Sequence, residues 1–218
     1  MAIDRSHKGL SRDAVVRAAL DLVEDQGIES LTIRGVASRL GSSPMSVYNH
    51  AVDRDDLLVG MLEAATADIP FHIDEPDALA RLTARYVATH DHLAARAWVL
   101  QVLIRGDLLA INAFAVADAC IGDLLELGLP PADAIYAHGI AWHLMLGELL
   151  DRHPAPPKST PTQRELVLRS MDVTIYPHYA HVLGVLDPSD APPPCQFERT
   201  IAVTLPGVVE RLAKPRPE

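Results

Sequence analysis

The segment from Thr32 to Leu58 places the strongest constraint on what this chain can fold into. Thr32 can cap a first helix, because its hydroxyl can accept a hydrogen bond from a free backbone N–H. Gly41 follows that helix, at the left-handed position that favours glycine. The apolar residues between them recur at the spacing of one helical face, namely Ile33, Val36, Ala37 and Leu40. The segment therefore begins with a short helix and a tight turn.

A second short helix is predicted directly after the turn. Ser43 is a good cap, and Pro44 suits the first helical position, where a missing N–H costs little. Val47 is expected in the core, which leaves five neighbours facing outward: Met45, Ser46, Tyr48, Asn49 and His50. Asp53 can cap a third helix. This is the layout of a helix-turn-helix, whose second helix enters the major groove of DNA.

The same pattern also fits an ordinary helical hairpin, because helix–glycine–helix sequences are common. Tyr48, Asn49 and His50 on an exposed short helix favour contact with a polar partner instead.

Composition indicates an all-α protein of about ten helices. Apolar residues make up 49% of the 218 residues and aromatic residues only 5%, and no convincing alternating strand occurs. No signal peptide and no apolar run of 18 residues is found, so we expect no membrane span. Cys120 and Cys195 share no motif, which favours a reducing cytoplasm and no disulfide.

The net charge of −10 is unusual for a DNA-binding protein, but it is unevenly distributed. Residues 1–52 contain six basic and six acidic residues and are neutral, so the whole net charge lies in residues 53–218. The acidic part should face away from DNA. Binding should then depend on a few placed contacts rather than on a broad basic surface.

Glycine, proline and capping residues divide the rest of the chain into helices. We expect them after Ser11 as far as Gly27, from Asp53 to about Asp68, from Asp74 to 95, over 96–104, over 108–127, from Pro131 to 153, from Thr160, and over 195–213. Proline-rich spans at 153–161 and 187–194 should be extended. Pro177 should interrupt or end its helix, and Pro206-Gly207 should kink the last one.

Several of these features resemble the tetracycline-repressor (TetR) family of bacterial transcriptional regulators. The motif is Thr32-x-Arg34, Ala37-x-x-Leu40-Gly41, Tyr48-x-His50 and then Leu57-Leu58. The resemblance covers nearly the whole chain and is strongest over Ser11–Leu58. It implies a DNA-binding domain over 1–52 and a ligand-binding and dimerisation domain over 53–218, with 53–68 as a linking helix.

The resemblance also implies roles for single residues. Four residues fall where the family contacts bases: Arg34, Pro44, Met45 and Asn49. Five fall where it contacts phosphates: Thr32, Ser46, Tyr48, His50 and Arg54. The chain departs from the family at two positions. Ala51 stands where many members have an aromatic residue, and Arg54 replaces the usual lysine. By the residues alone, Arg34 could instead pair with Glu29 or Asp25, and Tyr48 could pack under the turn.

The helices from Asp74 to Asp151 carry more polar and aromatic residues than a minimal core needs. We expect eight of them at a small-molecule site: Tyr86, His90, Trp98, Gln101, Phe114, His138, Trp142 and Met145. A packed core with a hydrogen-bonded histidine is the alternative for each one. No cofactor or resident metal is expected, because no histidine spacing forms a known metal motif. A ligand arriving as a metal chelate, as in the family's namesake, stays open.

A homodimer is implied through the helix after Pro131 and the final helix. The expected surface comprises Ala134, Ala137 or Ala141, Leu146, Leu149 and Leu150, together with Phe197, Ile201, Leu205, Val208 and Leu212. The resulting hypothesis is a non-enzymatic, cytoplasmic regulator. It would bind a palindromic operator as a homodimer and be released by a partly apolar small molecule. The alternatives are a helical ligand-binding protein or enzyme that uses the second domain, and a helical adaptor.

Overall fold

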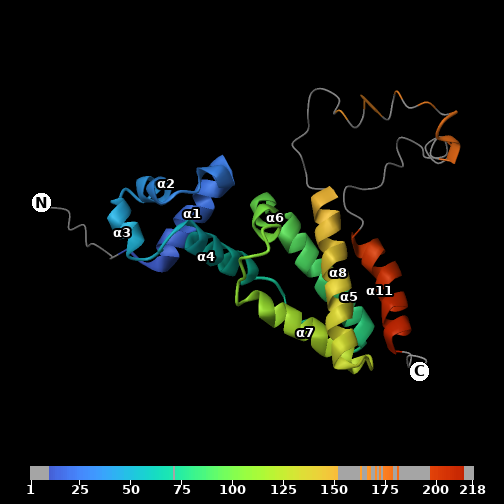
Figure 1. Ribbon diagram of the computed structural model, residues 1–218. Helices are drawn as coiled ribbons and strands as arrows, with labels where there is room; N and C mark the ends of the chain where they lie inside the picture. The colour runs from blue at the N-terminus through green and yellow to red at the C-terminus, as the bar shows by residue number, and fades with distance from the viewer. Residues whose placement is uncertain are drawn as a thin grey trace, which may run out of the picture.

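The computed structural model describes residues 10–70, 72–151 and 197–213, and single positions between 163 and 181. Over 10–70, 72–151 and 197–213 it contains nine α-helices and one 3-10 turn, and no described residue is in a strand, which confirms the all-α prediction (Figure 1). The helices are α1 (Arg12–Gln26), α2 (Ile33–Arg39), α3 (Pro44–Tyr48), α4 (Arg54–Thr66), α5 (Ala78–Ala94), α6 (Ala97–Leu103), α7 (Ala113–Glu126), α8 (Pro131–Asp151) and α11 (Phe197–Ala213), with the 3-10 turn η1 at Ile28–Ser30. Every helix in the described ranges is too short or too polar to span a membrane.

Residues 10–66, here called the head, form a separate lobe in Figure 1 that holds α1 to α4. Four of its helices begin at a side-chain cap. The oxygens of Ser11, Thr32, Ser43 and Asp53 accept from backbone N–H groups at 3.2, 2.9, 3.2 and 2.8 Å. Gly41 has φ +60°, in the left-handed region. These local predictions from the sequence are confirmed.

Close contact between α1 and α4 holds the head together. Gly60 of α4 faces Val16 of α1, and a Cβ at Gly60 would lie 2.8 Å from Val16 Cγ2. A side chain at this position would push the two helices apart, because buried helix contacts tolerate little added volume. Val15, Ala19 and Leu57 are almost fully buried beside this contact.

Helices α5 to α8 and α11 are here called the body. Within it, the other four helices pack around α5. This helix packs against α7, α8 and α11, and α8 and α11 lie side by side (Figure 1). Leu82 and Tyr86 of α5, Met145 of α8 and Ile201 of α11 are buried within this bundle. One continuous hydrophobic core joins the head and the body.

Two helix starts differ from the prediction. Asp74 does not begin α5; Asp77 does, because its carboxylate accepts from Ala80 N–H at 2.8 Å. The helix expected from 108 begins only at Ala113, after a turn whose residues help to enclose a cavity. Helix α11 contains Pro206 and remains helical on both sides of it. The proline-rich spans at 153–161 and 187–194, and most of the helix expected from Thr160, lie outside the described residues.

Candidate DNA-contact helix and ligand cavity

Helix α3 presents most of its surface to solvent. Val47 is its one buried residue, at 0% exposure, whereas Met45 is 70% and Tyr48 51% exposed. Pro44 and Asn49 are also exposed, at the two ends of the helix. The four predicted base-contacting residues, Arg34, Pro44, Met45 and Asn49, are therefore all on the surface of the head. Whether they contact bases is a prediction that the fold allows.

Arg34 lies on α2, and its side chain is exposed. Within the described residues Arg34 forms no ion pair with Glu29 or Asp25, and the carboxylate of Asp25 binds Arg39 Nη2 at 2.6 Å instead. The alternative in which Arg34 is neutralised by Asp25 or Glu29 is therefore not what the fold adopts. Its guanidinium is available for a planar acceptor pair such as guanine O6 and N7.

The five predicted phosphate-contacting residues differ in how much of each side chain is available. Tyr48 is exposed, and His50 is half-buried. The hydroxyl of Thr32 caps α2, and that of Ser46 shares a hydrogen bond with the Ser43 hydroxyl at 2.9 Å. Arg54 donates to the carbonyls of Leu31 and Ile28 at 3.1 and 3.2 Å. Arg54 thus already supports the turn before α2.

A structural role that the sequence reasoning missed belongs to Arg12. Its guanidinium donates to both carboxylate oxygens of Asp56, at 2.6 and 3.0 Å, and to the carbonyl of His50 at 2.7 Å. The hydrogen bond from Arg12 holds the pKa of Asp56 below its usual value. Arg12 therefore ties α1 to the end of α3 and the start of α4, which fixes the orientation of α3.

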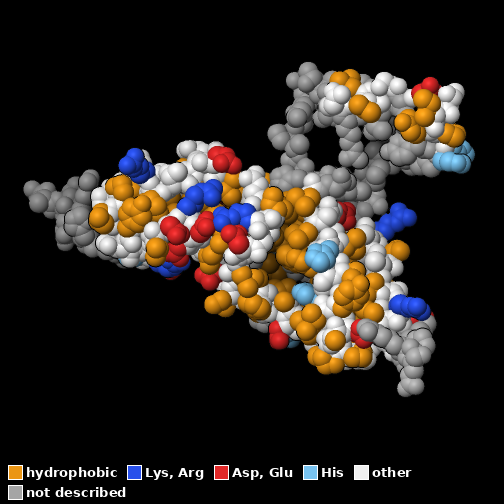
Figure 2. Space-filling view, in the orientation of Figure 1, with side chains coloured by type: hydrophobic (Ala, Val, Ile, Leu, Met, Phe, Trp, Pro, Cys, Tyr) orange, Lys and Arg blue, Asp and Glu red, His pale blue; other side chains and the backbone are white. Residues whose placement is uncertain are grey.

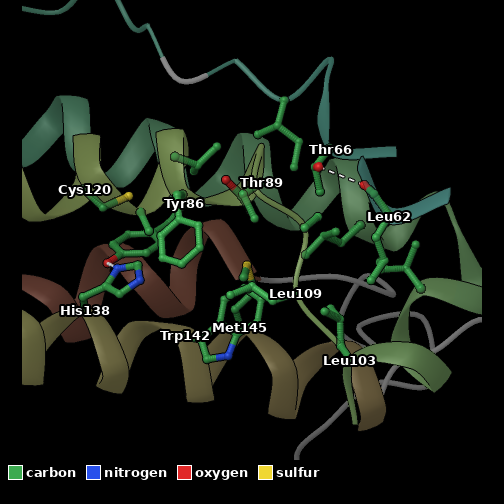
Figure 3. Close-up of a pocket in the computed structure, with 18 of the residues that line it drawn as sticks. Leu62, Thr66, Tyr86, Thr89, Leu103, Leu109, Cys120, His138, Trp142 and Met145 are labelled. Carbon is green, nitrogen blue, oxygen red and sulfur yellow. Dashed lines mark hydrogen bonds between the residues drawn. The ribbon is translucent and has the colours of Figure 1, made fainter. Parts of the chain in front are cut away.

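A cavity of about 250 Å³ lies between helices α4 to α8 and the loop that follows α6 (Figure 3). Five of the eight predicted ligand-site residues line it: Tyr86, Phe114, His138, Trp142 and Met145. Most of the remaining wall is aliphatic. Figure 2 shows hydrophobic side chains gathered on the face of the body around a hollow.

Tyr86 and His138 form a polar pair at one end of this cavity, near Cys120 (Figure 3). Tyr86 Oη and His138 Nδ1 are 2.9 Å apart, and the two rings stack at 6.0 Å between centroids. Burial raises the pKa of the Tyr86 phenol and lowers the pKa of His138, and it raises the pKa of the Cys120 thiol to about 12. All three groups are neutral at physiological pH.

The other three predicted ligand-site residues do not line the cavity. His90 is buried against α11, where its ring stacks on Phe197 with centroids 4.5 Å apart. Trp98 is packed in the core at 5% exposure, and Gln101 is exposed. Thr66 and Thr89, which were not singled out, do line it. A spacing of three and seven residues from Tyr86, at Thr89 and Leu93, could have indicated that face of α5.

Comparison with known proteins agrees with this geometry. Residues 15–61, which span most of the head, match the model of the tetR family of bacterial regulatory proteins. Over 55 residues the chain is 44% identical to the class C tetracycline repressor of Escherichia coli, covering 25% of each protein. The head of the chain therefore resembles the tetR family.

Similarity beyond the head is weaker. An HTH-type transcriptional regulator of Saccharopolyspora erythraea is 24% identical over 145 residues, which cover 64% of this chain and 60% of that protein. The match therefore spans about a quarter of the first relative and three-fifths of the second. Streptomyces coelicolor ActR, solved in complex with actinorhodin, shares the fold with a TM-score of 0.74. It is 19% identical, with 94% of this chain and 96% of that one covered.

The cavity and the head share helix α4. Leu62 and Thr66, near the end of α4, form part of the cavity wall (Figure 3). Arg105, in the body, contacts the start of α4. Its guanidinium donates to both carboxylate oxygens of Asp55, at 2.8 and 2.9 Å. Arg105 precedes the cavity-lining residues Leu108 to Ala110. The cavity wall therefore includes the end of α4, and the loop that lines it is linked to the start of α4.

The predicted dimer surface is in large part buried inside the subunit, because α8 and α11 pack against each other. Seven of its residues lie in that internal contact or in the core: Ala134, Ala137, Ala141, Leu149, Phe197, Ile201 and Leu205. Leu146, Val208 and Leu212 are half-buried, and Leu150 is 51% exposed. Further exposed apolar side chains on these two helices are Ile135, Tyr136 and Val203.

Proposed function

We propose that this chain is a ligand-responsive transcriptional repressor that binds a palindromic operator as a homodimer and is released by a small molecule. The observation that carries the proposal is helix α4, which forms part of the DNA-binding head and of the cavity wall at once. The relatives that match the head are named as transcriptional regulators or repressors, which favours regulation over catalysis.

In the DNA-bound state, α3 would lie in the major groove, with Arg34 and Asn49 near base edges. Tyr48 and His50 would contact phosphates. Because Arg12 and Arg54 are engaged within the head, they would support this arrangement rather than contribute charge to the DNA surface. The neutral charge balance of residues 1–52 predicts weak non-specific binding.

Control by a ligand requires two arrangements of the head, one that fits the operator and one that does not. The ligand must bind the second arrangement more tightly than the first. Leu62 and Thr66 of α4 would contact a bound ligand directly, and so would Leu108 to Ala110 in the loop before α7. Asn112 Nδ2 donates to the carbonyl of Glu63 at 3.1 Å, which adds a second link to α4. Displacement of α4 would change the separation of two α3 helices in a dimer.

The dimer is proposed through the exposed apolar side chains of α8 and α11. Analytical ultracentrifugation tests this. Val203→Glu should shift the chain toward monomer, because Val203 is 75% exposed on α11 and a charge would be buried at the interface. Val52→Glu, at 76% exposure in the head, is the matched control and should leave the dimer intact. Unchanged association of the Val203 variant would contradict this interface.

Selection from a pool of random-sequence DNA duplexes tests the regulator itself. The full chain should enrich an inverted repeat whose half-site centres lie about 34 Å or a multiple of it apart. Arg34→Ala should lose preference at one base position in each half-site while other positions keep theirs. Enrichment of no sequence would refute the proposed function.

A further inference from the structure

The cavity wall of the body carries no formal charge. Among the described residues that line it, none is Lys, Arg, Asp or Glu. The buried ion pair of Arg85 with Asp123, at 3.0 Å, lines a different surface depression. Transfer of a charged ligand into such a site costs several kcal/mol unless an opposite charge receives it. The wall therefore selects against ionised ligands.

Most hydroxyl groups of the wall already donate a hydrogen bond within the protein. Thr66 Oγ1 donates to the carbonyl of Leu62 at 2.8 Å, as Figure 3 shows, and Thr89 Oγ1 donates to the carbonyl of Arg85 at 2.8 Å. These oxygens can still accept a hydrogen bond but cannot donate a second one. The wall thus offers few donors to a ligand.

Tyr86 and His138 provide the principal polar contact. Their mutual hydrogen bond of 2.9 Å occupies one ring nitrogen of His138, and the Tyr86 hydroxyl also hydrogen-bonds with Cys120. The second ring nitrogen of His138 is left for a ligand. Both groups are neutral, since burial disfavours the phenolate and the imidazolium. This end of the cavity suits one uncharged hydroxyl or carbonyl group.

The size of the cavity limits the rest of the ligand. An apolar cavity of about 150 Å³ holds one benzene molecule. The 250 Å³ found here is therefore sufficient for roughly two fused rings. Phe114 and Leu109, which are 56% and 61% exposed, form part of the wall. Contact with an apolar ring would remove their exposed surface from water.

We propose that the cavity takes an uncharged compound of about two fused rings that carries one hydroxyl or carbonyl group, placed against Tyr86 and His138. Carboxylates of the same size are excluded. A metal chelate is also disfavoured, because the lining offers no carboxylate to hold the metal. This inference rests on the proposed function, since it names the ligand class to which that regulator responds.

Equilibrium dialysis of the full chain at neutral pH tests the ligand class with three matched probes: naphthalene, 2-naphthol and 2-naphthoate. We expect 2-naphthol to bind about tenfold more tightly than naphthalene, the effect of one hydrogen bond. We expect 2-naphthoate to bind at least a hundredfold more weakly than 2-naphthol. Equal or tighter binding of 2-naphthoate would overturn the proposal, and so would the absence of binding by all three probes.

Two variants test the polar end. His138→Leu and Tyr86→Phe should each reduce the preference for 2-naphthol over naphthalene to within about twofold, with naphthalene binding retained. Tyr86→Phe keeps the ring, so it provides the test if His138→Leu fails to fold. His143→Leu, on the exposed side of the same helix, is the control and should keep the full preference. A preference that survives in both test variants would overturn the role of this pair.

The two proposals fail separately. Specific duplex binding without any binding of 2-naphthol would overturn the proposed ligand class, and the proposed function as a transcriptional regulator would still stand. Binding of 2-naphthol with its expected preference, but without specific duplex binding, would refute the proposed function as a regulator. The proposed ligand class of the cavity would still stand.

Discussion

Val47→Ala tests how helix α3 is held, because Val47 is the one buried residue of that helix. The substitution removes two fully buried methyl groups. At about 0.8 kcal/mol for each buried carbon, the lost transfer free energy is about 1.6 kcal/mol. A residual cavity adds to this, so the free energy of unfolding should fall by roughly 2–3 kcal/mol. Capping by Ser43 remains, but it cannot replace the lost apolar contact.

Urea unfolding followed by circular dichroism measures this loss, at one protein concentration for all variants. Val52→Ala is the matched control, since Val52 is 76% exposed in the same head, and it should change stability by less than about 0.5 kcal/mol. Affinity for the selected duplex should fall for the Val47 variant alone, because a loosened α3 no longer presents its side chains together. Equal losses in the two variants, or no loss for Val47→Ala, would refute the reasoning.

Three further substitutions test other parts of the molecule. Arg34→Ala should cost about 1–3 kcal/mol at one base position in duplex binding, whereas uniform weakening over all sequences would contradict base contact. Asp123→Asn should lower the free energy of unfolding by roughly 3 kcal/mol in urea unfolding, because it leaves the 97%-buried Arg85 without its anionic partner; a loss below 1 kcal/mol would show that the pair is dispensable. Arg105→Ala should reduce by at least twofold the change in duplex affinity caused by 2-naphthol, since it releases Asp55 of α4; an unchanged ligand response in a duplex titration would exclude that link.

Features that depend on neighbouring residues in the chain could be predicted from the sequence. The caps at Thr32, Ser43 and Asp53 and the left-handed Gly41 are such features, because each is decided within one helical turn. The predicted start of α5 at Asp74 is wrong, although the start of this helix is also decided by a local cap. Several acidic residues precede that helix. The carboxylate of Asp77 accepts from Ala80 N–H in the first turn, whereas that of Glu75 accepts from Asp77 N–H before the helix begins.

Features that depend on distant segments could not be predicted in this way. The Tyr86–His138 pair joins residues 52 apart, and the sequence does not show which histidine faces α11 and which faces the cavity. Arg54 was expected at a phosphate, but its guanidinium reaches the carbonyls of a turn more than 20 residues earlier. The internal packing of α8 on α11 likewise buries Ala137, which the family resemblance, with Ala141 as the other option, implied at a dimer surface.

The central claim, sequence-specific DNA binding by this chain, is tested most directly by fluorescence anisotropy with two duplexes. One carries the inverted repeat obtained by selection, and the other has the same base composition in scrambled order. At physiological salt the dissociation constant for the first should be at least about a thousandfold lower. Equal dissociation constants for the two duplexes would contradict the claim.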